Sequence, residues 1–306
     1  MRPTCPICAG RDSHAYQSRF AVPLRTCRNC SARYVHPIPP RLQLRARYER
    51  EHLSGKWDVL LDQGPTEEPA RRAELLRRLQ QCGQDGEPPR GRLLDIGFGD
   101  GRFLDGAADA GWSCVGIEIS HAAAKGVTGR HPVAVASLDA IVDTPTLDAV
   151  TFWDVLEHLA EPAAAVRKAA RRLRAGGLLA ASMPSLSSVT ARVEGPGWRY
   201  YDLDTYGHLV HMSPRHLRLL FEAEGLRIVH LETRGSVDLR HSLWVGRPSQ
   251  KGIVGAVLDR LSGLVARLFA PRGYGNTILI VGQREAAPSG SGPGAAPGRR
   301  AGGTTR

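Results

Sequence analysis

Four cysteines near the start of the chain have the spacing of a metal site. They form two pairs, Cys5 with Cys8 and Cys27 with Cys30, and each pair is a Cys-x-x-Cys knuckle. Two such knuckles can close over one ion and supply the four thiolates of a tetrahedral zinc site. Because protein ligands would fill every coordination position, we expect a structural zinc that a module this small needs in order to fold.

The segment LLDIGFGDGRFL is the second candidate for chemistry. Gly97, Gly99 and Gly101 follow an apolar run that contains Asp95. Glycine allows the backbone to approach a ligand closely. The third glycine of the dinucleotide fingerprint would fall where Arg102 stands, and no Lys-Ser/Thr pair follows as in a phosphate-binding P-loop. The segment therefore departs from both of these nucleotide-binding patterns.

An acidic residue ends the next apolar run, SCVGIEIS. This residue, Glu118, could accept hydrogen bonds from both hydroxyls of a ribose if the run is the second strand of an α/β sheet. The alternative is that the glycines form only a tight turn between a strand and a helix. The position of Glu118 favours a ligand.

Four segments, in this order, resemble the class I S-adenosylmethionine-dependent methyltransferases: LLDIGFGDGRFL, GIEIS, LDAVTFWDVLEHLAEP and ARRLRAGGLLAASMPS. The resemblance covers about residues 90–185. It implies a doubly wound, Rossmann-like α/β sheet of seven strands with S-adenosylmethionine as the methyl donor. It also implies that Asp95, Gly97 and Gly99 surround the methionine moiety. Glu118 would hold the ribose, and Ile119 would pack against the adenine.

The end of the third expected strand departs from the family pattern. Related enzymes often place an acidic residue there to meet the adenine amine, but here Ser137 and Leu138 come first and Asp139 follows. The cofactor-binding residues that we predict are Asp95, Gly97, Gly99, Gly101, Glu118, Ile119, Ser137, Leu138 and Trp153.

The segment WDVLEHL, after the fourth expected strand, should border the methyl acceptor. His158 could remove a proton from the acceptor, because imidazole titrates near neutral pH. Alternatively, Glu157 and His158 only cap the next helix. In ubiquinone-pathway methyltransferases, which this segment resembles, a similar acidic–histidine cluster can hold a divalent metal.

Two further histidines, His208 and His211, lie in the segment GHLVHMSPRHL. They either cap the helix expected from Pro214 or reach over the strand ends to the acceptor. Similar enzymes carry a related GHLHHFSP-like segment, and this resemblance favours the acceptor. The aromatic run WRYYDLDTY just before them could line an acceptor site or belong to the core. The candidate catalytic residues are His158, His208 and His211.

The elements that position these residues follow from the alternation of apolar runs with helical patterns over 91–285. This alternation predicts a parallel, doubly wound sheet. The helix before the strand LLAASMP should end at Gly176 and Gly177, where glycine is a common C-cap. The other regions are a zinc ribbon over 1–40, a helical linker or cap over 41–90, and a disordered tail over 286–306.

An amphipathic insertion over 253–270 lies between the last two expected strands, and its helix covers 253–269. We expect this helix to pack on the domain or to cover the acceptor site. The alternatives are a dimer face or a peripheral contact with a membrane surface. The sequence does not determine the oligomeric state.

The net charge of +11 points to an acidic partner. However, only four of the 41 basic residues are lysine, and the preference for arginine in a chain rich in Ala, Gly and Pro in part reflects its overall composition. An RNA methyltransferase that docks RNA through its zinc ribbon is therefore the alternative function. Against it, no N-P-P-[YF] or D-P-P-W motif follows the fourth strand. We expect a cytoplasmic enzyme, since no signal peptide is visible. It would methylate a hydroxyl of a small molecule or of a glycan or secondary-metabolite precursor.

Overall fold

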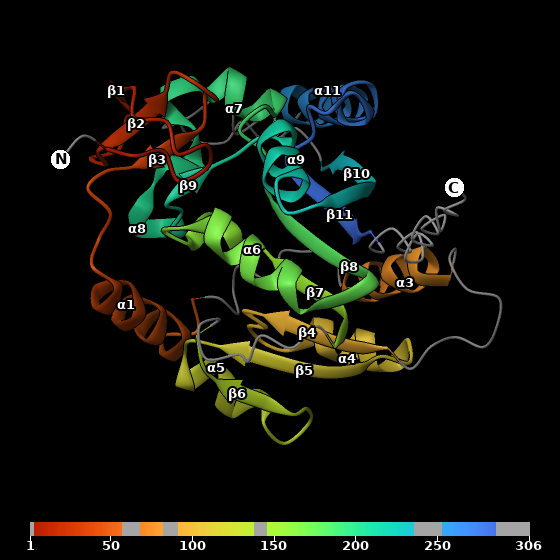
Figure 1. The fold of residues 1–306 in the computed structure, drawn as a ribbon. Coiled ribbons are helices and arrows are strands. Elements are labelled where there is room, and N and C mark those ends of the chain that lie inside the picture. The colour runs from red at the N-terminus through yellow and green to blue at the C-terminus, as the bar shows by residue number, and fades with distance from the viewer. Residues whose placement is uncertain (1–2, 57–67, 82–90, 138–145, 236–252, 286–306) are drawn as a thin grey trace, which may run out of the picture.

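The computed structural model describes residues 3–56, 68–81, 91–137, 146–235 and 253–285 (Figure 1). Its centre is a seven-stranded sheet with the order β10-β11-β8-β7-β4-β5-β6. The strands are β4 (Arg92–Ile96), β5 (Ser113–Glu118), β6 (Val133–Val135), β7 (Leu147–Trp153), β8 (Leu173–Pro184), β10 (Leu226–Arg234) and β11 (Thr277–Arg284).

The direction of the strands corrects one prediction. Strands β4 to β8 are parallel to one another, but β11 runs antiparallel to both β8 and β10. The expectation of an all-parallel sheet is therefore wrong at β11. Strand β11 lies between β8 and β10. It pairs directly with β10, the strand before it in sequence, and an antiparallel pair of this kind needs no crossover connection.

Helices cover both faces of this sheet, α6 and α9 on one face and α3, α4 and α5 on the other. The helices of the described residues are α1 (Arg41–Leu53), α3 (Glu68–Gln81), α4 (Arg102–Asp109), α5 (His121–Val127), α6 (Pro162–Arg172), α7 (Val189–Glu194), α8 (Leu203–Tyr206), α9 (Pro214–Glu222) and α11 (Ile253–Phe269). Alternate residues of a strand point to opposite faces. Accordingly, Leu94 and Ile96 of β4 join an apolar cluster with α6 and α9, whereas Leu93 joins a second cluster with α3, α4 and α5.

The end of α6 differs from the prediction. The helix stops at Arg172, and Gly176 and Gly177 lie inside β8 rather than at a helix C-cap. Leu173 is fully buried and already pairs with Leu147 of β7, so the sheet captures the chain before it reaches the glycines. Tertiary pairing outweighs the local stop signal here.

A second, four-stranded sheet has the order β1-β2-β3-β9. The ribbon supplies β1 (Ser13–Tyr16), β2 (Leu24–Cys27) and β3 (Arg33–Val35), while β9 (Val210–His211) comes from the segment just before α9 (Figure 1). His211 therefore lies in a strand and not in the loop that the sequence suggested. The ribbon therefore shares one sheet with residues 207–213, which are called the acceptor segment below.

The helix α11 has the predicted position and length, but five of its apolar side chains are exposed. The exposed fractions lie between 41% and 53%, for Val257, Leu261, Leu264, Leu268 and Phe269, whereas Ser262 is buried. The expectation that the apolar face packs on the domain is therefore wrong for these five positions.

Candidate cofactor and acceptor site

The glycine loop follows β4 and has a backbone that favours glycine at three positions. Gly97, Gly99 and Gly101 have φ values of 75°, 54° and 81°. A Cβ at Gly97 would lie 2.6 Å from the Val155 side chain, but a Cβ at Gly99 would meet no atom within 4 Å. Gly99 thus combines a left-handed backbone with open space above it, so a ligand can approach the main chain there.

Glu118 links the end of β5 to this loop. Its carboxylate accepts hydrogen bonds from the amides of Ile119 (2.6 Å), Ser120 (3.2 Å) and Gly99 (3.4 Å). The side chain of Ile119 is exposed beside it. The arrangement places a buried carboxylate and an open apolar side chain next to Gly99, as the predicted ribose and adenine contacts require.

Asp95 lies beneath the loop. It is fully buried and its Oδ1 accepts a hydrogen bond of 2.6 Å from the Thr151 hydroxyl of β7. Burial raises the pKa of Asp95 to about 7. This hydrogen bond links β4 to β7, and the contact of Asp95 with the methionine moiety stays a prediction.

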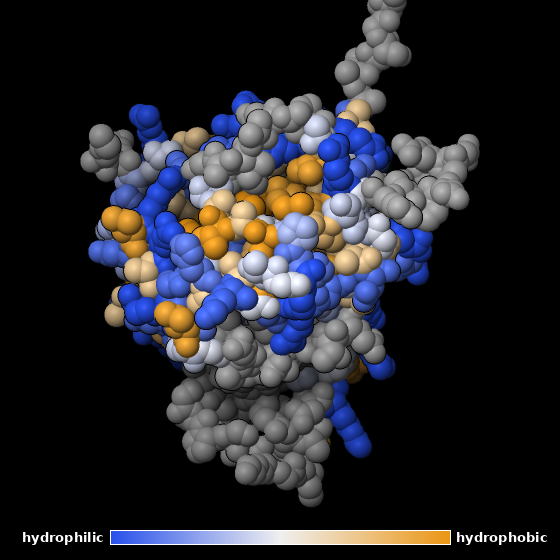
Figure 2. Space-filling model, turned by 90° about the horizontal axis from the view of Figure 1, so that it is seen from below, coloured by the Kyte–Doolittle hydropathy of each residue, from blue (hydrophilic) through white to orange (hydrophobic). Residues whose placement is uncertain are grey.

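The remaining predicted cofactor residues differ in their exposure to solvent. Trp153 is largely buried, packs edge-on against Phe103 with ring centroids 5.0 Å apart, and lies under the Arg72 guanidinium. Ser137 is exposed after β6, the edge strand. Leu138 lies outside the described residues. Figure 2 views the molecule from below, the side on which α5 and β6 lie in Figure 1. On this side, apolar side chains gather in a hollowed area bordered by hydrophilic ones.

The end of β7 leads into the segment 154–159 through a strained residue. Asp154 has a φ of 56°, a conformation that non-glycine residues rarely adopt and that often marks functional sites. Its carboxylate accepts a hydrogen bond of 3.2 Å from the Ser182 hydroxyl. The short 3-10 helix η2 (Leu156–His158) follows and carries Glu157 inward, where it is almost completely buried.

Glu157, His158 and His208 come together, although the last is far away in sequence. One ligating atom from each lies within 4.8 Å of the others. The His158 and His208 rings have centroids 4.7 Å apart, and His208 Nε2 is 3.9 Å from Glu157 Oε1. Neither carboxylate oxygen of Glu157 has a hydrogen-bond partner among the described residues. Burial and the nearby charge of Asp154 raise the pKa of Glu157 well above its usual value.

The hydrogen bond of His158 fixes its tautomer. Nδ1 lies 3.2 Å from the Gly207 carbonyl oxygen, which can only accept, so Nδ1 carries the hydrogen. Burial lowers the pKa of His158 to about 4, which keeps the ring neutral near pH 7. Nε2 therefore has a lone pair that can accept a proton or bind a metal.

His208 and His211 are packed among the aromatic residues that precede them. His208 stacks on Tyr200 with centroids 5.2 Å apart, and His211 meets Trp198 and Tyr201 edge-on at 5.7 and 4.8 Å. Burial lowers the pKa of His211 to about 3. Neither His211 Nε2 nor Trp198 Nε1 has a hydrogen-bond partner in the described part of the chain.

The four ribbon cysteines come together as their spacing predicts. The Sγ atoms of Cys5 and Cys30 are 3.7 Å apart, those of Cys8 and Cys27 are 3.6 Å apart, and all four lie within 4.8 Å of one another. A disulfide would need about 2.05 Å. Tetrahedral zinc with bonds of about 2.3 Å separates its sulfurs by roughly 3.8 Å. The thiols therefore fit a zinc ion.

Two ribbon arginines have hydrogen-bond partners within the protein. Arg25 donates a 2.9 Å hydrogen bond to the Ser13 hydroxyl, and Arg33 bonds the Tyr201 hydroxyl. Arg28 lies 3.4 Å from Asp12 in an exposed ion pair and remains on the surface. The contacts of Arg25 and Arg33 reduce the basic surface that the ribbon could offer to RNA.

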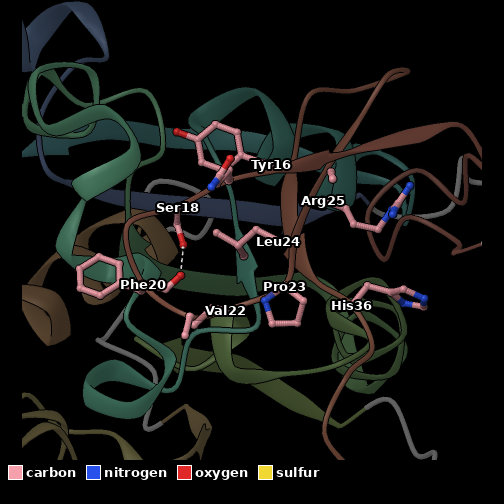
Figure 3. Close-up of a pocket in the computed structure, with 11 residues that line it drawn as sticks. Tyr16, Ser18, Phe20, Val22, Pro23, Leu24, Arg25 and His36 are labelled. Atoms are coloured by element: carbon pink, nitrogen blue, oxygen red, sulfur yellow. Dashed lines mark hydrogen bonds between the residues drawn. The ribbon is translucent and has the colours of Figure 1, made fainter.

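A cavity of about 580 Å³ lies in the ribbon, where Phe20, Val22 and Pro23 supply much of the lining (Figure 3). The loop that forms it is held by a 2.8 Å hydrogen bond from the Ser18 hydroxyl to the Phe20 carbonyl oxygen. The Tyr16 ring borders the cavity and lies 5.5 Å from that of Tyr201, which contacts His211. A chain of aromatic rings thus joins the ribbon to the acceptor segment.

The sequence predicted a helical linker or cap over 41–90, without site residues. In the structure, Glu49 of α1 accepts hydrogen bonds from the amides of His121 (2.8 Å) and Ala122 (3.1 Å) at the start of α5. The only signal was Tyr48, the one aromatic residue of an arginine- and glutamate-rich helix. Among the described residues, no helix has both the length and the apolar character needed to span a membrane.

Comparison with known proteins agrees with this geometry. A family model described as a methyltransferase domain matches residues 68–231. The ubiquinone biosynthesis O-methyltransferase of Alkalilimnicola ehrlichii is 38% identical over 96 residues, which cover 28% of this chain and 38% of that relative. The chain thus spans about two fifths of this curated relative's length.

Two solved structures share the fold. An S-adenosylmethionine-dependent methyltransferase from Archaeoglobus fulgidus has a TM-score of 0.52 at 18% identity, covering 74% of this chain and 99% of its own. The 1,6-didemethyltoxoflavin-N1-methyltransferase of Burkholderia thailandensis, solved with its substrate and S-adenosylhomocysteine, has a TM-score of 0.51 at 12% identity, covering 90% and 100%. The chain belongs to the methyltransferase-domain family and has the fold of these S-adenosylmethionine-dependent methyltransferases.

Proposed function

We propose that this protein methylates a hydroxyl group of a small molecule or of a glycan or secondary-metabolite precursor. The observation that carries the proposal is the group of buried polar atoms beside the acceptor histidines. The Glu157 carboxylate, His211 Nε2 and Trp198 Nε1 have no hydrogen-bond partner among the described residues. Leaving such atoms unpaired is costly, so a polar acceptor that pairs with them would be favoured.

The cofactor would lie over the carboxyl ends of β4 and β5. Gly99 would offer its backbone and Glu118 would hold the ribose, exchanging its present bonds to backbone amides for bonds to hydroxyls. S-adenosylmethionine supplies a methyl group that is already activated by the sulfonium charge. The protein's main task is then to align donor and acceptor.

His158 is the candidate base. Its Nδ1–H is held by the Gly207 carbonyl, so the lone pair of Nε2 can take the proton of an acceptor hydroxyl. His208, stacked on Tyr200, and His211, held in β9, would form the wall of the acceptor site. Burial lowers the pKa of these three histidines and keeps them neutral, so each ring has a nitrogen with a lone pair.

The same residues also fit a divalent cation. Glu157, His158 and His208 present one carboxylate and two imidazoles within 4.8 Å, and the unpaired carboxylate oxygens would gain a partner. A cation there would lower the pKa of an acceptor hydroxyl. The ribbon cysteines would hold a structural zinc ion and not take part in the chemistry.

The test is methyl transfer from S-adenosylmethionine to three sets of acceptors: phenols and catechols, nucleoside-diphosphate sugars, and total RNA. We expect formation of S-adenosylhomocysteine together with a product one methyl group heavier in one of the first two sets. Methylation of RNA alone, with binding that weakens steeply as salt rises, would replace this proposal by the RNA alternative.

A further inference from the structure

The helix α1 spans the region between the cofactor end and the acceptor end of the site. At one side, the Glu49 carboxylate accepts hydrogen bonds from the amides that open α5, directly after Glu118 and Ser120. At the other side, the Tyr48 ring meets the His158 ring edge-on, with centroids 5.8 Å apart. Adjacent residues of one helix thus contact the surroundings of both the ribose carboxylate and the candidate base.

The position of α1 is fixed by a buried ion-pair cluster. Glu51 Oε1 accepts hydrogen bonds of 2.8 Å from both Arg47 and Lys56. The Arg47 guanidinium also donates to the Asp204 carbonyl oxygen at 2.9 Å, which ties α1 to α8. Because the helix is held at both sides, the fold determines where Tyr48 lies.

The Tyr48 hydroxyl is buried without a hydrogen-bond partner among the described residues. Burial raises the pKa of Tyr48, with the negative charges of Glu51, Glu157 and Glu118 adding to the effect, so the hydroxyl keeps its proton. The Tyr48 ring lies beside His158, and its neighbour Glu49 binds the amides that follow Ser120, so Tyr48 stands between the two ends of the site. An unpaired buried hydroxyl costs free energy that an added acceptor atom would recover.

We propose that Tyr48 is a cofactor-binding residue, whose hydroxyl donates a hydrogen bond to bound S-adenosylmethionine while α1 forms the outer wall of the cofactor site. The methionine carboxylate and the ribose oxygens of the cofactor are acceptors, and Tyr48 offers the donor that they need. The inference rests on the assigned methyl donor and goes beyond the glycine loop and Glu118. It also makes the segment after the ribbon part of the active site.

The test is calorimetric titration of S-adenosylmethionine and S-adenosylhomocysteine into the full-length protein and two variants. Tyr48→Phe keeps the ring beside His158 and removes only the hydroxyl. Tyr274→Phe is the matched control, because Tyr274 packs on Phe269 at the end of α11. We expect about five- to tenfold weaker binding of both ligands in Tyr48→Phe and less than a twofold change in Tyr274→Phe.

Thermal unfolding without ligand separates the loss of a contact from misfolding, and we expect both variants to unfold close to the unaltered protein. Unchanged affinity of Tyr48→Phe for both ligands would overturn the proposal. So would unchanged affinity with slower turnover, since the hydroxyl would then face the acceptor. A lack of binding by the unaltered protein would instead count against the assigned methyl donor.

Discussion

Arg33 of the ribbon is paired in antiparallel register with His211 of the acceptor segment. A second link lies nearby, where His216 Nε2 donates a 2.7 Å hydrogen bond to the Cys30 carbonyl oxygen while Nδ1 accepts from the Ser213 amide that opens α9. The Cys27–Cys30 knuckle is therefore connected to the acceptor segment through one strand pair and one histidine.

Loss of the zinc site should loosen the acceptor segment first. We expect Cys27→Ser, or zinc chelation, to raise hydrogen exchange of residues 209–216 while β4 and β5 stay protected, because β9 depends on β3 for its pairing. Hydrogen–deuterium exchange with mass spectrometry measures this. Cys114→Ser is the control, since Cys114 is buried in β5 and outside the ribbon. Equal exchange of 209–216 in all forms would contradict the connection.

Gly99→Val should remove cofactor binding without a large loss of stability. The new side chain would occupy the open space above the loop, and the left-handed φ would cost about 1–2 kcal/mol. Gly111→Val is matched, because Gly111 also has a positive φ and open surroundings, but it lies in the turn between α4 and β5. We expect similar melting temperatures and loss of S-adenosylmethionine affinity only in Gly99→Val, by calorimetry.

Glu118→Ala should weaken S-adenosylmethionine binding by about a hundredfold, because two charge-assisted hydrogen bonds to the ribose would be lost. The comparison is Glu49→Ala, which removes another carboxylate that accepts backbone amides close by. Calorimetry should show the larger effect for Glu118→Ala. Equal effects would mean that both residues act only by holding the loops.

His158→Gln should lower turnover by about 10² to 10⁴ and leave cofactor affinity unchanged, as expected for a base that acts on the acceptor. Steady-state kinetics with whichever acceptor is methylated in the screen described under Proposed function, together with calorimetry, separates the two. His121→Gln, at the start of α5, is the control. Turnover unchanged in His158→Gln would assign the base elsewhere.

His211 should make the fold sensitive to acid. Its folded pKa of about 3 lies below the usual value, so the unfolded chain takes up a proton that the folded protein does not. The stabilisation by the neutral histidine is complete above about pH 6.5 and is lost as the pH falls towards 3. Relative to His211→Phe, the unaltered protein should lose about 2 kcal/mol of unfolding free energy between pH 7.5 and pH 5. Denaturant titration measures this, with the exposed His14→Phe as control. Parallel pH profiles for both would contradict the assignment.

The sequence predicted the parts of the site whose signals are local. The glycine loop, Glu118 at the end of a strand, and the Cys-x-x-Cys pairs can each be recognised from a few consecutive residues. The structure places Glu118 beside Gly99 and brings the four cysteines together. The strands β4 to β8 were also predictable, because their apolar runs are bounded by clear turns.

Contacts between distant segments were not predictable in the same way. The pairing of β3 with β9, the docking of Glu49 on α5, and the early start of β8 at Leu173 depend on partners far along the chain. Gly176 and Gly177 are good local stop signals, yet sheet pairing overrides them. The outward-facing leucines of α11 likewise depend on packing that helical periodicity alone does not specify.

The shared sheet also sets an order of assembly. During synthesis the four cysteines and β1 to β3 emerge first and can bind metal early, but their partner strand β9 is made only after β4 to β8. Joining Tyr34 to Val210 is therefore a late, long-range step that pairs the N-terminal ribbon with a segment made after most of the central sheet. A chain released before residue 211 would hold the four cysteines and a nascent domain, but not the complete four-stranded sheet.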